Sequence, residues 1–112
     1  DTQWGRAKGF DTFCPLGPWI DTDFDPSEAM ISCRVNGELR QMSSTHEMIF
    51  PVQQLVAYLS SIMTLLPGDV ILTGTPAGVG MGMQPQTWLK AGDTVRIEID
   101  GLGVLENPVV AH

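Results

Sequence analysis

The sequence has few basic residues, and those it has do not cluster. Six lysines and arginines stand against 13 aspartates and glutamates, which gives a formal net charge of −7 at pH 7. Proteins that bind nucleic acid present a run or patch of positive charge, and anionic membrane surfaces attract the same feature. The charge pattern therefore argues against a nucleic-acid partner and against a membrane-surface protein.

Cysteines and long apolar runs are also scarce. The two cysteines, Cys14 and Cys33, are too few for a disulfide framework and are expected to be free thiols in a cytoplasmic protein. No apolar stretch approaches the ~20 residues that a membrane-spanning helix needs. No signal peptide is visible. These absences exclude a disulfide scaffold and a membrane span.

Charged residues make up only 17% of the 112 residues, whereas hydrophobic residues make up 43%. A chain of this length forms one domain at most, and its apolar content suffices for a packed core. So low a charged fraction is unusual for a free-standing small domain. We therefore expect part of the surface to be covered by a partner or by further chain.

The middle of the sequence predicts a β-hairpin followed by a helix. In "MISCRVNGELRQM" polar and apolar residues alternate, and Asn36-Gly37 supplies the pair with positive φ of a type I′ turn, with Leu39 and Gln41 on the return strand. The period then lengthens to three and four residues, which predicts a helix at about 51–65 that ends at Pro67-Gly68. The apolar positions of this helix are Val52, Leu55, Val56, Leu59, Ile62 and Met63.

Three further strands are expected towards the C-terminus. The run Val70-Ile71-Leu72 is short, continuous and apolar, which is typical of a strand buried on both faces. In "TVRIEI" Val95, Ile97 and Ile99 lie on one face and Arg96 and Glu98 on the other. After Asp100-Gly101 the stretch "VLENPVV" forms the last strand. The pattern predicts a mostly β domain with one main helix, as a rolled or barrel-like sheet.

Two stretches are candidates for a small-molecule site. Lys8 stands in "AKGFDTF", among glycine and aromatic residues, where a partly desolvated ammonium could hold a carboxylate or stabilise an enolate. Thr75 follows Gly74 in "LTGTPAGVG", where a strand end presents hydroxyls and free backbone N–H groups and glycine lets a ligand come close. An ordinary solvated lysine and a structural turn are the alternatives for these two stretches.

Other motifs do not reach the pattern that their chemistry needs. Gly78, Gly80 and Gly82 lack the Lys-Ser/Thr and the helix of a phosphate loop. The alternating acids at 21, 23 and 25 lack the glycine and glutamate of a calcium loop. His46 and His112 have no partner at the spacing of metal ligands. Cys14 with His46 is only a weak candidate for a catalytic nucleophile and its base. We therefore expect no metal ligands in this chain.

Several motifs in fixed order resemble the C-terminal part of the catalytic domain of the fumarylacetoacetate hydrolase family. They are "AKGFDTFCPLGPW", "VNGELRQ", "MIF", "MTLLPGDVILTGTPAGVG" and "LKAGDTVRIEIDGLGVLENPV". The resemblance extends over essentially the whole chain. It is strongest to bacterial acylpyruvases and 2-hydroxyhepta-2,4-diene-1,7-dioate isomerases.

The resemblance implies a rolled mixed β-sheet around the active site, a homodimer and a bound Mg²⁺ or Mn²⁺. In the family the metal holds a small oxo acid and stabilises its enolate. Lys8 matches the lysine beside the metal that holds the substrate or its enolate oxygen, and Thr75 matches the threonine that grips the substrate carboxylate. The three acidic metal ligands of the family lie upstream of Asp1, so none is in this chain.

We therefore expect residues 1–112 to be the C-terminal portion of a single catalytic domain, whose N-terminal half carries the metal ligands. The expected function is C–C hydrolysis, decarboxylation or tautomerisation of small oxo acids, and the isolated fragment should be inactive. One alternative is a hydratase or decarboxylase of 2-hydroxy-2,4-dienoates. Another is a non-catalytic remnant that serves as an interaction module.

Overall fold

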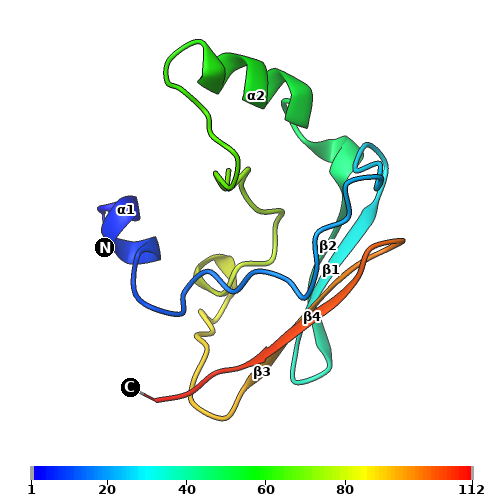
Figure 1. Cartoon of the computed structure of the whole chain (residues 1–112). Coiled ribbons are helices and arrows are strands. Elements are labelled where there is room, and N and C mark those ends of the chain that lie inside the picture. The colour runs from blue at the N-terminus through cyan, green and yellow to red at the C-terminus, as the bar shows by residue number, and fades with distance from the viewer. Residues whose placement is uncertain (1, 112) are drawn as a thin grey trace.

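The structure is a computed structural model and describes residues 2–111, so that Asp1 and His112 lie outside the described part. Most of its regular structure is β-strand (Figure 1). Along the chain the elements are α1 (Trp4–Lys8), β1 (Met30–Val35), β2 (Glu38–Ser44), η1 (Thr45–Glu47), α2 (Val52–Ser60), η2 (Gly80–Gly82), β3 (Thr94–Ile99) and β4 (Gly103–Pro108).

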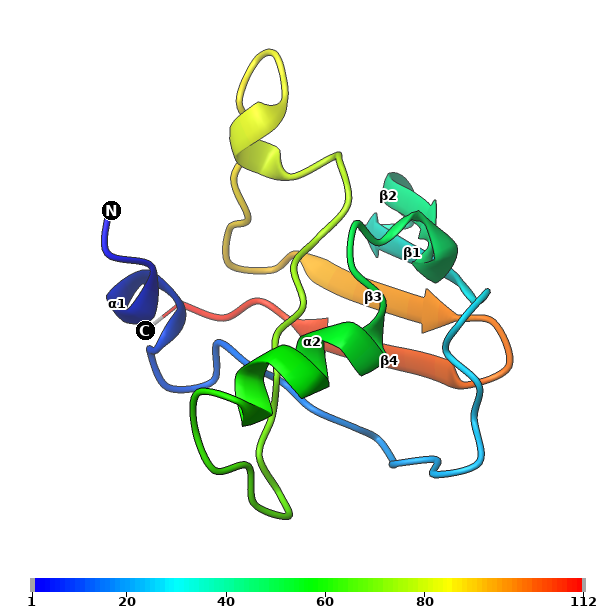
Figure 2. The ribbon, with the colours of Figure 1, turned by 90° about the horizontal axis from the view of Figure 1, so that it is seen from above.

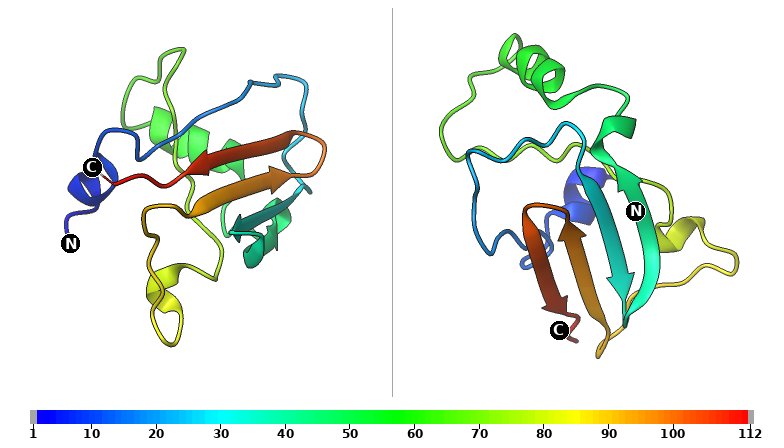
Figure 3. Two further views of the ribbon diagram at one scale, coloured as in Figure 1. Left: turned by 90° about the horizontal axis from the view of Figure 1, so that it is seen from below. Right: turned by 90° about the vertical axis from the view of Figure 1, so that its right-hand side faces the viewer.

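The four strands form one antiparallel sheet in the order β2-β1-β3-β4. Figure 3 (right) shows this sheet face-on, open at both edges. The mostly β prediction is thus confirmed. The prediction of a rolled, mixed sheet is not met within residues 2–111, because every pairing is antiparallel and the sheet does not close.

The predicted hairpin joins β1 and β2. Asn36 and Gly37 form its turn with φ values of 52° and 83°, as a type I′ turn requires. A residue outside the hairpin also stabilises the turn. The side-chain oxygen of Asn36 accepts a hydrogen bond from the backbone N–H of Thr94 at 2.9 Å. This contact ties the β1–β2 turn to the first residue of β3.

A β-bulge interrupts the hairpin two residues after its turn. Arg34 pairs with Leu39, but Cys33 pairs with Gln41, so Arg40 is an extra residue in β2. Residues that face each other on antiparallel strands point to the same side of the sheet. Gln41 therefore shares a face with Cys33, while Leu39, only two residues away, shares the opposite face with Arg34.

The two faces of the sheet differ in chemistry. On the outer face the guanidinium of Arg96 in β3 forms ion pairs with the carboxylates of Glu98, at 3.5 Å, and of Glu106 in β4, at 3.6 Å. The other face, here called the inner face, carries Val95, Ile97 and their neighbours, as the alternation predicted. Figures 1 and 2 show both helices and the long loops on one side of the sheet. The loop residues that reach the sheet line grooves with inner-face residues.

Asp93, directly before β3, is a second residue that contacts the hairpin turn. The residue is buried, with 6% of its surface exposed. One carboxylate oxygen accepts from Asn36 Nδ2 and the other from the backbone N–H of Lys90, both at 2.9 Å. The hydrogen bond from Asn36, more than any other contact, lowers the pKa of Asp93 below its ordinary value.

Stability is expected to fall in acid partly through Asp93. Because its pKa is lower in the folded chain, the stabilisation is fully present above the unfolded pKa and is lost as the pH falls through the folded pKa. Asp93→Asn removes this titration. We expect the variant to be less stable than the parent at pH 7 and to lose less stability from pH 5 to pH 3, measured by denaturant unfolding. If the stabilities of the parent and of the variant fall in parallel from pH 5 to pH 3, Asp93 does not contribute to the loss of stability in acid.

The helix is shorter than predicted, since α2 ends at Ser60 rather than near residue 65. Two hydroxyl groups act at its end. The hydroxyl of Ser60 donates to the carbonyl of Ala57 at 3.0 Å, and that of Ser61 donates to the carbonyl of Tyr58 at 2.7 Å. Serines bonded in this way compete with the helical hydrogen bonds that would continue the last turn.

The predicted strand at Val70–Leu72 is wrong. These residues form no regular element and pair with no strand among residues 2–111, and Val70 and Leu72 are 56% and 67% exposed. An apolar run becomes a buried strand only where a neighbouring strand satisfies its backbone. Here the segment crosses the space between α2 and the sheet without one (Figure 1).

The packed core expected from composition is also missing from the described part of the chain. Ala29, at 6% exposure, is its one buried hydrophobic residue, and many large apolar side chains are exposed. Extensive contact between described elements is confined to neighbouring strands. None of the described helices combines the length and the apolar character needed to cross a membrane.

Candidate functional site

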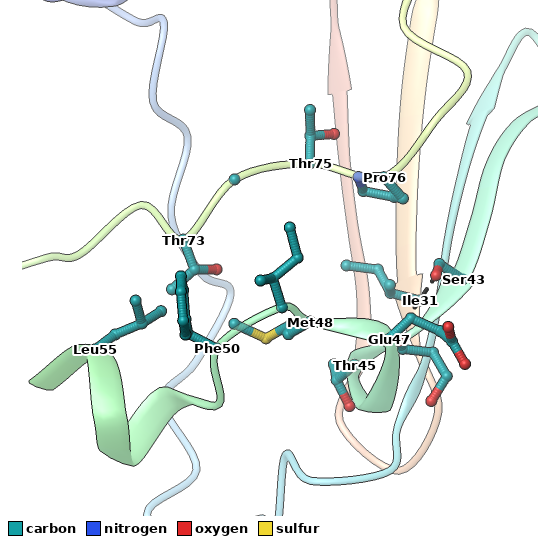
Figure 4. A pocket seen from close by; sticks show the side chains of 13 residues that line it. Ile31, Ser43, Thr45, Glu47, Met48, Phe50, Leu55, Thr73, Thr75 and Pro76 are labelled. Carbon is teal, nitrogen blue, oxygen red and sulfur yellow. Dashed lines mark hydrogen bonds between the residues drawn. The ribbon is translucent and has the colours of Figure 1, made fainter.

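The segment Thr73–Pro76 forms one wall of an open groove of about 510 Å³. The opposite wall comes from residues between β2 and α2, and Ile31 and Ser43 of the sheet form one end. Figure 4 shows Met48 and Phe50 facing this segment across the groove. The lining residues are Ile31, Ser43, Ser44, Thr45, Glu47, Met48, Ile49, Phe50, Leu55, Thr73, Gly74, Thr75 and Pro76. The groove is thus mainly apolar, with hydroxyl groups along its edges.

Gly74 changes the direction of the chain within this wall. In a regular extended segment Thr73 and Thr75 would point to the same side. Gly74 has a φ of 109°, which side-chain-bearing residues rarely adopt, and so it breaks the alternation. In Figure 4 the side chain of Thr73 points towards Phe50, whereas that of Thr75 points away from it. The two predicted site residues, Gly74 and Thr75, therefore belong to one turn of the chain.

Gln41 of β2 holds this turn. Its Nε2 donates to Thr75 Oγ1 and to the backbone oxygen of Pro76, both at 2.8 Å. The carbonyl oxygen of Pro76 can only accept, so the nitrogen of the amide must face it. The side chain of Gln41 comes from the inner face of the sheet, where the bulge at Arg40 directs it.

Lys8 lies apart from the groove. It is the last residue of α1 and is exposed, and its Nζ lies 5.7 Å from the centre of the Trp4 ring, in a cation–π contact. It is not among the residues that line the groove beside Thr75. Lys8 is thus not part of the turn that contains Gly74 and Thr75, and the substrate-holding roles of all three residues stay predictions.

A second groove of about 490 Å³ lies between the inner face and the loop over residues 78–90. Arg40 borders it, paired with Glu38 at 3.2 Å and donating to the sulfur of Met83 at 3.2 Å. Cys33 also lines it, and burial raises the pKa of its thiol. Cys33 is therefore protonated at neutral pH and is unsuited to nucleophilic attack.

The other candidates of the sequence do not assemble into a site. Asp21 caps a turn by accepting from the backbone N–H groups of Asp23 and Phe24, and Asp25 accepts from Ser27. This is what a solvated acidic loop does. Cys14 and Cys33 are free thiols. Over residues 2–111 no three His, Cys, Asp or Glu side chains come together as a metal site. The described residues therefore do not fit a divalent cation.

One residue that holds the turn carried no signal as a site residue in the sequence. Gln41 was predicted only as part of the return strand. Gly78 lies so close to β2 that a Cβ atom there would overlap the carbonyl oxygen of Arg40. A polar residue at an inward position of a strand could have drawn attention to Gln41, but only if the bulge had been known.

The sequence and the fold both match known proteins. Residues 1–110 match the family model described as "Fumarylacetoacetate (FAA) hydrolase C-terminal". A mitochondrial oxaloacetate tautomerase of Rattus norvegicus is 54% identical over 111 residues, which are 96% of this chain and 36% of the rat protein. The chain thus spans little more than a third of that relative.

Two solved structures are informative. A 2-hydroxyhepta-2,4-diene-1,7-dioate isomerase from Mycobacterium marinum is 52% identical, with a TM-score of 0.87, over 97% of this chain and 40% of that one. A maleylpyruvate hydrolase from Sphingobium sp. SYK-6, solved in complex with manganese(II) and pyruvate, is 40% identical, with a TM-score of 0.80, over 90% of this chain and 37% of that one.

Proposed function

Because this chain belongs to the fumarylacetoacetate hydrolase family, we propose that the complete protein is an enzyme that acts on small 2-oxo acids. The observation that carries the proposal is the chemistry shared by the named relatives. Oxaloacetate, maleylpyruvate and pyruvate each contain a 2-oxo carboxylate, and a 2-hydroxy-2,4-dienoate is the enol form of one. The fragment common to these compounds is a carboxylate beside a ketone or its enol.

The reaction class follows from the same fragment. Tautomerisation, isomerisation and C–C hydrolysis of such acids all pass through an enolate, whose negative oxygen must be stabilised. We propose that the hydroxyl of Thr75 and the nearby backbone of Gly74 hold the substrate carboxylate. We further propose that the Lys8 ammonium holds the enolate oxygen, which requires Lys8 to reach a substrate bound beside Thr75.

A divalent metal belongs to the proposal for the complete protein only. The described residues do not fit one, because no three His, Cys, Asp or Glu side chains among them come together. The manganese(II) complex of the Sphingobium hydrolase supports a divalent ion in the family. We propose Mg²⁺ or Mn²⁺, held by acidic residues in a part of the protein that precedes this C-terminal portion of the catalytic domain.

Assembly and compartment are proposals of the same kind. The large apolar side chains exposed on residues 10–20 and 62–72 are suited to burial against the rest of the domain or against a second copy in a homodimer. A cytoplasmic location stays a prediction, because the rat relative is named as mitochondrial and family membership therefore does not fix the compartment.

Turnover of a 2-oxo acid by the complete protein is the direct test. With Mg²⁺ or Mn²⁺ present, we expect activity on oxaloacetate (tautomerisation), maleylpyruvate (hydrolysis) or 2-hydroxyhepta-2,4-diene-1,7-dioate (isomerisation), each followed by its enol absorbance. EDTA should abolish the activity and excess metal should restore it. No turnover of any of the three, in a folded and metal-supplemented protein, would refute the proposal.

A further inference from the structure

We propose that Gln41 is a positioning residue that orients the Thr75 hydroxyl as a hydrogen-bond donor to the substrate carboxylate. The inference rests on the proposed function and extends it to a residue outside the wall of the groove. It starts from the two hydrogen bonds that Nε2 of Gln41 donates, to Thr75 Oγ1 and to the Pro76 carbonyl, each at 2.8 Å.

The hydrogen bonds fix where the proton of Thr75 can go. An amide nitrogen carries two protons and accepts none, so both of its protons are used by Pro76 and Thr75. The hydroxyl oxygen of Thr75 is therefore an acceptor towards Gln41, and its own proton is directed elsewhere. A hydroxyl that already accepts one hydrogen bond is also a better donor, because neighbouring hydrogen bonds polarise each other. Such a donor suits a carboxylate oxygen.

The second hydrogen bond of Gln41 holds the backbone of the turn as well as the hydroxyl of Thr75. Because the same nitrogen holds the backbone at Pro76, the side chain and the main chain of the turn are fixed from one point. Thr75 is exposed and follows a glycine with a φ of 109°, so its local backbone is intrinsically free to move. Gln41 is anchored in β2, one residue beyond the bulge at Arg40. A sheet residue thus sets the position of a loop residue.

The expected kinetic signature is a change in KM. The carboxylate is not the reacting group, so its hydrogen bond acts equally in the ground state and in the transition state. Gln41→Met keeps the length of the side chain and removes both donated hydrogen bonds. We expect KM of the complete protein for its 2-oxo acid to rise about tenfold with kcat within about threefold.

Gln41→Glu should act more strongly than Gln41→Met. A glutamate carboxylate accepts only, so it would accept the hydrogen bond that the Thr75 hydroxyl should donate to the substrate, repel the Pro76 carbonyl and place negative charge beside the substrate carboxylate. We expect KM to rise by about 100-fold. Gln54→Met, on the exposed side of α2, is the matched control and should leave both constants unchanged.

A double-mutant cycle with Thr75→Val separates positioning from a purely structural role. If Gln41 acts through the hydroxyl, Gln41→Met should change KM less than about twofold in the Thr75→Val background, and Thr75→Ser should restore the full effect of Gln41→Met. If Thr75→Val raises KM but Gln41→Met raises it equally with and without the hydroxyl, or not at all, the positioning role is wrong and the proposed function stands. A folded parent protein without turnover overturns both.

Discussion

Replacing Lys8 by methionine is expected to lower kcat of the complete protein by about 100- to 1,000-fold, the usual cost of losing one group that stabilises an oxyanion. The negative charge on the enolate oxygen develops in the transition state, so its stabilisation appears in kcat. Methionine keeps an apolar stem of similar length and removes the ammonium, whose Nζ lies 5.7 Å from the centre of the Trp4 ring. The measurement is steady-state turnover of the 2-oxo acid on which the parent is most active.

The control for this variant is the second of the two lysines in the sequence. Lys90→Met removes the same charge from the loop before β3 and should leave kcat within about threefold of the parent. The role proposed for Lys8 is wrong if Lys8→Met also stays within threefold. The comparison with Gln41 is a further test, because Lys8→Met is expected to lower kcat whereas Gln41→Met is expected to raise KM.

Replacing Gly78 by alanine is expected to destabilise the protein by about 3 kcal/mol or more, as backbone strain and overpacking add. Gly78 has a φ of 106°, and an added Cβ would overlap the carbonyl oxygen of Arg40. The overlapping atom belongs to the backbone of β2, so neither side can give way by a rotamer change. The free energy of unfolding in denaturant measures this cost.

Gly92→Ala separates the two causes. Gly92 has a similar φ of 93° but nothing within 4 Å of its added Cβ, so this variant should lose only the backbone part, about 1–2 kcal/mol. Equal losses in the two variants would show that the contact between Gly78 and β2 contributes nothing.

The sequence predicted the parts of the fold whose cause is local. The Asn36-Gly37 turn and the alternation of Val95 to Ile99 depend on a few neighbouring residues, and both are confirmed. The strand at Val70–Leu72 and the packed core were wrong because each requires partners elsewhere. An apolar run shows only that a segment prefers burial, and it does not show whether the described chain supplies the covering layer.

The geometry of the candidate site could be predicted only in part for the same reason, and the roles of its residues stay predictions. Gly74 and Thr75 are adjacent in sequence, and the turn that they form follows from the glycine. Gln41 joins them from 34 residues away, and only the register of β2 brings it there. A regular two-residue hairpin would place Arg40 opposite Cys33. The bulge places Gln41 opposite Cys33 instead, and no residue near Arg40 indicates in the sequence that a bulge forms there.

The extra residue in β2 divides the hairpin into two stretches with different tolerance of changes in length. On the turn side of Arg40, a change in loop length alters only the tip of the hairpin, since the pairs Val35–Glu38 and Arg34–Leu39 lie there. Beyond it, the loss or gain of one residue would rotate every following side chain of β2 to the other face. Among related sequences, insertions and deletions should therefore gather at the tip, and the spacing from Gln41 to Ser44 should remain constant.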